Sequence, residues 1–90
     1  MTPEQERQQH ICAAYRAAQS AIPMFVVYRP ITSDYPGKWV ARMHLTEPDA
    51  PTDLLIEADT LVGIRIQLPP EAVNIGRYFY DNPVIEEVWL

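Results

Sequence analysis

The chain has 90 residues and a mass of 10.3 kDa, which leaves room for one hydrophobic core and predicts a single domain over residues 1–90. Hydrophobic residues make up 48% and charged residues 21%, so the composition excludes a disordered, collagenous or coiled-coil chain. The net charge of −5 and the pI near 4.8 oppose nonspecific binding to nucleic acid, and we expect no nucleic-acid partner.

The charge is unevenly distributed along the chain. Residues 1–45 carry five basic and three acidic side chains, a net +2, whereas residues 46–90 carry two basic and nine acidic ones, a net −7. An acidic half suits a protein partner with a basic patch, although acidic surfaces more commonly serve only solubility. Four carboxylates of this half are candidate partner-binding residues that would steer a partner electrostatically: Asp49, Asp53, Glu57 and Asp59.

Cysteine usage and hydropathy bear on the compartment. The single Cys12 cannot form an internal disulfide, and no apolar run approaches the length of about 18 residues that spans a membrane. The first six residues are acidic and polar, unlike the basic and apolar start of a signal peptide. We therefore expect a cytoplasmic protein without membrane association.

The first predicted element is a helix over residues 3–20. Thr2 is suited to the N-cap, Pro3 to the first helical position, and Gln5 completes a capping box. Pro23 should stop the helix. One apolar stripe recurs at helical spacing and consists of Ile11, Ala14, Tyr15, Ala18 and Ile22.

Two strands are predicted next. Residues 24–29 are mainly aromatic and β-branched, and both alternating sets are apolar, which indicates an interior position in a sheet. Residues 35–38, Tyr-Pro-Gly-Lys, fit a type II turn. The turn leads into a strand over residues 38–45, which should pair antiparallel with the first strand across the loop 31–37. Alternation places on its core face Trp39, Ala41, Met43 and Leu45.

The middle of the chain is less regular. Residues 46–53 are polar and contain two prolines, which predicts a surface loop, and residues 54–58 should form a short strand. Residues 59–68 fit both a helix capped by Asp59 and an alternating strand, and Gly63 weakens both. We favour a short helix that ends at the prolines 69 and 70.

The C-terminal part should contain a short strand at 77–80, a turn at 81–83 and a final strand at 84–90. Together these elements predict an α+β fold. Its N-terminal helix, about residues 3–20, packs on a small, mainly antiparallel sheet of three to five strands within residues 24–90, with or without a second short helix.

Three stretches of the sequence carry a family resemblance. They are Ala58-Asp59-Thr60-Leu61 with Arg65 and Leu68-Pro69, the ending Asp81 to Leu90, and the aromatic-Pro-Gly turn before the strand that bears Arg42. These stretches resemble a family of small uncharacterised proteins encoded by bacteriophages and prophages. The resemblance covers about residues 24–90, and the N-terminal helix is an addition to it. It implies a phage or prophage context, with the host cytoplasm as the compartment, and a helical segment at 60–68, from whose pattern Gly63 and Ile66 depart. It implies no chemistry.

Catalytic and metal-binding patterns are weak. His10 and Cys12 would point about 200° apart on a helix, and His44 could reach Cys12 only through tertiary folding. A zinc site would need all three and a carboxylate, and the acidic run 47–59 lacks the glycine and ligand spacing of a calcium loop. Adjacent Glu86 and Glu87 would face opposite sides of a strand and could not form an acid and base pair. We expect no catalytic residue, metal or cofactor.

A protein partner is the favoured alternative. One layer of helices covers one face of a sheet, yet the predicted strands are apolar on both faces, so some apolar surface is left over. The alternative is that the loops 31–37 and 46–53 fold over this surface and cover it. The hypothesis is a noncatalytic protein-interaction domain, an accessory factor of a phage that modulates a host protein, in which aromatic anchors add to the acidic residues. The alternatives are a phage assembly component that forms homo-oligomers and a small enzyme that uses carboxylates or His44. The candidate anchors are Tyr78, Tyr80 and Trp89.

Overall fold

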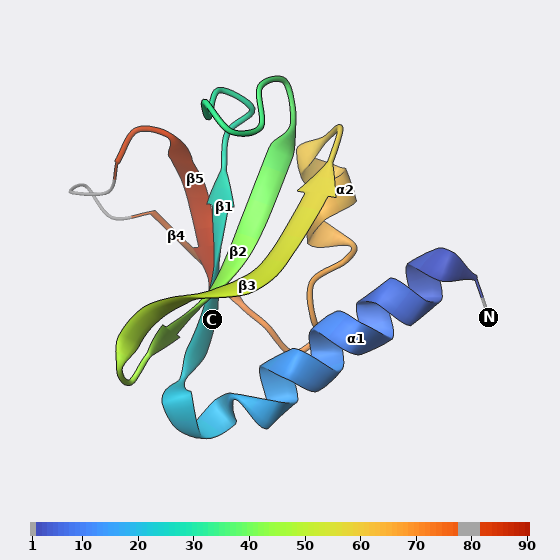
Figure 1. Cartoon of the computed structure of the whole chain (residues 1–90), viewed down its shortest axis with the longest axis vertical. Helices are drawn as coiled ribbons and strands as arrows, with labels where there is room; N and C mark the ends of the chain where they lie inside the picture. Colours follow the sequence, from blue (N-terminus) through green and yellow to red (C-terminus); the bar gives the residue numbers. More distant parts are fainter. Residues whose placement is uncertain (1, 78–81) are drawn as a thin grey trace.

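The computed structural model describes residues 2–77 and 82–90 (Figure 1). Within these residues five strands form one antiparallel sheet in the order β3-β2-β1-β5-β4, and β1 is interior, as predicted. The fold is α+β, which confirms the predicted class. In chain order the elements are α1 (Pro3–Ala17), a 3-10 turn η1 (Gln19–Ala21), β1 (Pro23–Tyr28), β2 (Trp39–Thr46), β3 (Asp49–Ala58), α2 (Leu61–Arg65), β4 (Asn74–Gly76) and β5 (Ile85–Trp89).

Helix α1 begins with the predicted capping box. The backbone N–H of Gln5 donates to the Thr2 hydroxyl (3.2 Å), and the Thr2 N–H donates to the Gln5 side chain (2.9 Å). The first two turns are polar and largely exposed, and burial begins at Ile11, so the N-terminal end of α1 extends beyond β3 and α2 (Figure 1). The helix ends at Ala17, earlier than predicted, because the 3-10 turn η1 takes over. Ile22, predicted in the apolar stripe, is instead exposed with φ 53°.

The core lies between one face of the sheet and the two helices. The ring of Tyr15 on α1 stacks on Phe25 of β1 with a centroid distance of 5.9 Å. Trp39 and Leu45 pack against this core, as the alternation of β2 predicted. We call this side of the sheet the covered face. Its buried cluster comprises Ile11, Tyr15, Phe25, Val27, Ala41, Met43, Ile56, Ile64, Leu68 and Ala72.

Of the two connections that flank β2, the turn before it was predicted correctly and the connection after it was not. Gly37 has φ 78° and the Lys38 N–H donates to the Tyr35 carbonyl (3.2 Å), which confirms the type II turn. The predicted loop 46–53 is wrong, because β3 already begins at Asp49, which pairs with Thr46 across a tight turn. Of the two prolines on which the loop prediction depended, Pro48 lies in this turn and Pro51 lies within β3. Pro51 is tolerated because β3 is an edge strand, where the backbone N–H on the outer side has no partner strand.

Residues 61–65 form the helix α2, which confirms the favoured interpretation of this segment. The cap is Thr60 rather than Asp59: the Thr60 hydroxyl accepts from the Gly63 N–H (3.0 Å). Asp59 instead forms an ion pair with Lys38. Both side chains are capable caps, so the local pattern did not distinguish them.

Of the C-terminal strands, β5 pairs with β1 and β4 pairs with β5 at the edge of the sheet. The final strand is confirmed as β5, whereas β4 was not predicted because it is only three residues long and ends in a glycine. The strand predicted at 77–80 lies outside the described residues except for Arg77, which is not in a strand. The predicted turn at 81–83 also begins outside them, and within it the Asn82 carbonyl accepts from the Ile85 N–H (2.9 Å).

Candidate functional site

The opposite side of the sheet is packed by neither α1 nor α2, and we call it the open face. Cross-strand pairing joins Val26 of β1 to Arg42 of β2 and to Val88 of β5, and joins Tyr28 to Val40. The three valines are buried, although neither helix packs on this side. The open face therefore has an apolar floor with a cation and a phenol above it.

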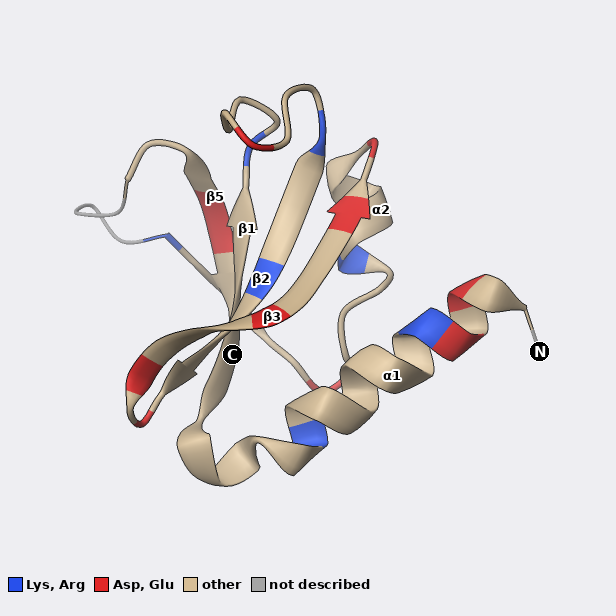
Figure 2. Cartoon of the chain, viewed as in Figure 1, with Lys and Arg blue, Asp and Glu red and all other residues tan. Residues whose placement is uncertain are grey.

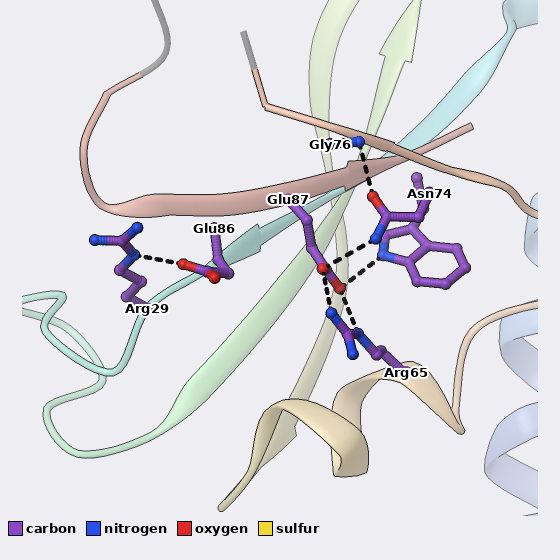
Figure 3. A network of polar contacts seen from close by, with 7 residues as sticks. Arg29, Arg65, Asn74, Gly76, Glu86 and Glu87 are labelled. Atoms are coloured by element: carbon purple, nitrogen blue, oxygen red, sulfur yellow. Dashed lines mark hydrogen bonds and ion pairs between the residues drawn. The ribbon is translucent and has the colours of Figure 1, made fainter. Parts of the chain in front are cut away.

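An apolar patch lies at the β5–β4 end of the open face. Val73, Ile75 and Leu90 are 61%, 46% and 41% exposed. Val73 and Leu90 exchange two backbone hydrogen bonds of 2.8 and 2.9 Å, which places them side by side. The side chain of Asn74 points to the covered face (Figure 3), so alternation places Val73 on the open face. Ile75 lies at a bulge of β4, between the pairs Asn74–Trp89 and Gly76–Val88, where the bulged strand opposes the open-face residue Val88. The strand patterns predicted the leftover apolar surface on β1 and β2, but there the open-face residues Val26 and Val40 are buried. The exposed apolar patch instead lies on and beside β4 and just after β5.

The edge strand β3 carries the predicted acidic residues. Asp49, Asp53 and Glu57 are exposed along it, and Figure 2 shows acidic positions spaced over its length with no basic one between them. Asp59 lies just beyond the strand and is paired with Lys38. The structure thus brings three of the four candidate carboxylates onto one sheet edge. Sequence reasoning missed this arrangement because it placed two of them in a loop.

The predicted aromatic anchors are not on this surface among the described residues. Trp89 lies on the covered face, where it packs against the core and its indole N–H donates to Glu87 (2.9 Å). Tyr78 and Tyr80 lie outside the described residues. Trp89 therefore contributes to the core and to the Glu87 hydrogen bonds, and it is not part of the open face.

A pocket of about 180 Å³ opens where the β1–β2 loop meets the open face. Arg42 is half-buried there, and its Nη1 donates to the Thr52 carbonyl (2.7 Å). Arg42 forms no ion pair with a carboxylate in the described parts of the chain, although Asp34 lines the same pocket. The lining residues are Tyr28, Thr32, Asp34, Tyr35, Val40, Arg42 and Leu55.

Arg42 also affects two titrating neighbours. Burial raises the pKa of Tyr28, and the positive charge of Arg42 partly opposes that increase. Burial lowers the pKa of His44, and Arg42 lowers it further. The Tyr28 hydroxyl lies 3.5 Å from Nε2 of His44. Tyr28 and His44 are therefore both partly desolvated and both affected by the charge of Arg42.

Thr32 gives a stability prediction. Its hydroxyl oxygen is buried and has no hydrogen-bond partner among the described residues. Replacing an unsatisfied buried hydroxyl by a methyl group of similar shape removes a desolvation cost, so we expect Thr32→Val to raise the free energy of unfolding by up to about 1 kcal/mol in urea titrations. The matched control is Thr52→Val, because the Thr52 hydroxyl donates to the Met43 carbonyl (2.7 Å). This control should lose about 1 kcal/mol, and equal losses in both variants would contradict the assignment.

A second polar cluster surrounds Glu87 on the covered face (Figure 3). Glu87 is 4% exposed, and Arg65 donates to both of its carboxylate oxygens (2.9 and 2.7 Å). Asn74 (3.1 Å) and Trp89 (2.9 Å) donate to the same carboxylate. Glu86 pairs instead with Arg29 (2.6 Å), so the two adjacent glutamates have different partners. The register of β5 on β1 shifts at Glu86, so the alternation on which their predicted opposite placement depended does not hold there. The Glu87 cluster joins α2, β4 and β5, and its carboxylate is saturated with donors.

The Glu87 cluster should make stability depend on pH in acid. Hydrogen bonds from Arg65 lower the pKa of Glu87, with smaller contributions from Trp89 and Asn74 against the opposing effect of burial. Its stabilisation is therefore fully present above the unfolded pKa of about 4.3 and is lost as the pH falls through the folded pKa. The stability difference between wild type and Glu87→Gln should shrink below about pH 4.3, and a constant difference would contradict this assignment. Glu71, whose pKa Arg16 lowers, titrates in both proteins and cancels.

The candidate catalytic residues are separated. Cys12 is buried on α1 and His10 is exposed. His44 belongs to the open face through its pairing with Met24 and its contact with Tyr28, so the sheet lies between it and α1. Over residues 2–77 and 82–90, no group of three or more His, Cys, Asp or Glu residues could hold a metal ion. In the same residues, neither helix has the length and apolar character needed to cross a membrane.

Comparisons of the chain with models of protein families, with curated proteins and with solved structures give no match. The phage-family resemblance therefore depends only on the short stretches quoted from the sequence. The candidate functional surface is the open face, which carries the apolar patch, the pocket and the acidic edge strand β3.

Proposed function

We propose that this chain is a noncatalytic protein-interaction domain whose open face docks on another protein. The observation that carries the proposal is the placement of both helices on one side of the sheet, which leaves Val73, Ile75 and Leu90 exposed together on the other. Exposed apolar clusters of this kind are typical of contact surfaces. The family resemblance supports an accessory factor of a phage or prophage that binds and modulates a host protein.

The charges on the open face favour a partner that carries basic side chains. The acidic strand β3 lies at one edge of the sheet and the apolar patch at the other. A partner that covers both needs an apolar centre with basic residues on one side, so that association is steered by charge and held by apolar contact.

Self-association through β3 is disfavoured by the same residues. Antiparallel pairing of two copies of β3 centred on Asp53 would place Asp53 opposite itself and Asp49 opposite Glu57. Like charges directly opposite each other destabilise a strand pair, and charged edges protect sheets from such pairing. The alternative function, a phage assembly component, requires stable homo-oligomers. The experiment below distinguishes it from the proposed function.

The test uses one exposed isoleucine on each side of the molecule. Ile75→Lys places a charge in the apolar patch, whereas the control Ile66→Lys places it just after α2, where Ile66 is 68% exposed. Immobilised wild type and Ile66→Lys should retain the same protein from a bacterial lysate, and Ile75→Lys should lose it.

Charge reversal of Asp53 and Glu57 should weaken capture most at low salt, because the contribution of steering is screened as salt rises. Equal capture by wild type, Ile75→Lys and Ile66→Lys would contradict the proposal. So would stable homo-oligomers in size-exclusion chromatography with light scattering, a result that favours the assembly component instead.

A further inference from the structure

The pocket at the β1–β2 loop carries two opposite charges that do not neutralise each other. Arg42 and Asp34 both line it, yet no ion pair joins them. Arg16, Arg29 and Arg65, by contrast, each pair with a glutamate. A half-buried guanidinium without a carboxylate is a costly arrangement for a protein to hold, unless a ligand supplies the missing anion.

The guanidinium of Arg42 is prepared for such a ligand. The strand β2 fixes its backbone, and the bond from Nη1 to the Thr52 carbonyl (2.7 Å) fixes one side of the fork. The remaining N–H groups match the two oxygens of a carboxylate, the geometry in which arginine binds most strongly.

From these features we infer that the pocket binds a small zwitterionic amino acid. Its carboxylate is held by Arg42 and its ammonium group by Asp34, while Val40 and Leu55 provide an apolar floor. A net anion would be opposed by the chain's charge of −5, but a zwitterion is neutral overall and meets no such opposition. A volume of about 180 Å³ accommodates only a small molecule.

The inference does not depend on the proposed protein partner, because it is tested with the isolated chain. The probes are glycine, β-alanine and γ-aminobutyrate, which differ in the spacing between the ammonium and carboxylate groups, together with acetate, which lacks the ammonium group. Each is titrated into isotope-labelled protein and followed by NMR. We expect saturable shifts at Val40, Leu55 and the rings of Tyr28 and Tyr35, with an affinity in the millimolar range and one preferred spacing.

Two variants and a control separate the roles of the charges. Asp34→Asn, in an exposed loop, should weaken amino-acid binding about fivefold and leave the weak binding of acetate unchanged. Arg42→Gln should weaken both about tenfold, and Arg7→Gln on α1 should change neither. Absence of saturable shifts at the pocket for all three amino acids would overturn the inference. An equal loss of acetate binding and amino-acid binding in Asp34→Asn would also overturn the inference. This comparison does not use Arg42→Gln, so it remains informative if that variant disturbs β3.

Discussion

Replacing Glu87 with alanine should lower the free energy of unfolding by about 2–3 kcal/mol, the largest loss that we expect from a single polar residue of this chain. The carboxylate is almost fully buried and accepts four N–H donors from Arg65, Asn74 and Trp89. Its removal leaves the half-buried Trp89 indole N–H and the Asn74 amide without their acceptor. Arg65 adds less to the loss, because its side chain is 42% exposed and can be solvated.

The adjacent Glu86 is the matched control. It lies on the same strand and forms a partly exposed ion pair with Arg29, outside the Glu87 cluster. Glu86→Ala should cost about 0.5 kcal/mol or less, since exposed pairs contribute little. Urea unfolding followed by tryptophan fluorescence and circular dichroism measures both variants. Equal losses of unfolding free energy in the two variants would show that the hydrogen bonds of the Glu87 cluster do not stabilise the packing of α2 on the sheet.

Gly63→Ala should also destabilise the chain, by about 1–2 kcal/mol, although alanine is the better helix former. A Cβ atom at position 63 would lie 2.9 Å from the Cβ of Ala58 on β3 and 3.1 Å from the Thr60 hydroxyl oxygen. Carbon atoms normally pack at about 3.5–4.0 Å. The helix must therefore move away from the sheet, and the packing cost exceeds the propensity gain of about 1 kcal/mol.

A double-mutant cycle identifies the contact that causes the effect. In the background of Ala58→Gly the Cβ neighbour is absent, so Gly63→Ala should become neutral or stabilising there, whatever Ala58→Gly costs by itself. Thermal unfolding of the four proteins gives the coupling energy. Additive effects of the two substitutions would contradict a close approach of α2 to β3 at this point.

The parts of the fold that could be predicted depend on neighbours in sequence. Thr2 and Gln5 form a capping box within one turn, and Pro36 with Gly37 specifies a type II turn. The inward set of β2 follows from simple alternation. The start of β3 was predicted wrongly because Pro51 is tolerated in an edge strand but not in an interior one. Which strand lies at the edge depends on the pairing of the whole sheet and cannot be inferred from neighbouring residues.

In the candidate site, too, local features could be predicted from the sequence and features that depend on the tertiary fold could not. An exposed acidic segment could be inferred from residue patterns alone. The exposed apolar patch could not, because it involves the unpredicted strand β4, whereas the valines of β1 and β2 that suggested a leftover surface are buried. The pocket could not, because Asp34 meets Arg42 only after the β1–β2 loop folds back over the sheet. The Glu87 cluster likewise requires Arg65 and Asn74 to be brought from separate elements, and only the spacing of Glu87 and Trp89 is local.

The most direct test of the uncovered sheet face is the solvent accessibility of its methyl groups in solution. In a methyl-labelled sample with a soluble paramagnetic probe, relaxation at Val73, Ile75 and Leu90 should be enhanced nearly as strongly as at exposed Ile66. Buried Ile56 and Ile64 should be protected. Protection of 73, 75 and 90 equal to that of Ile56, in dilute and concentrated samples alike, would show that this side of the sheet is covered and contradict the account.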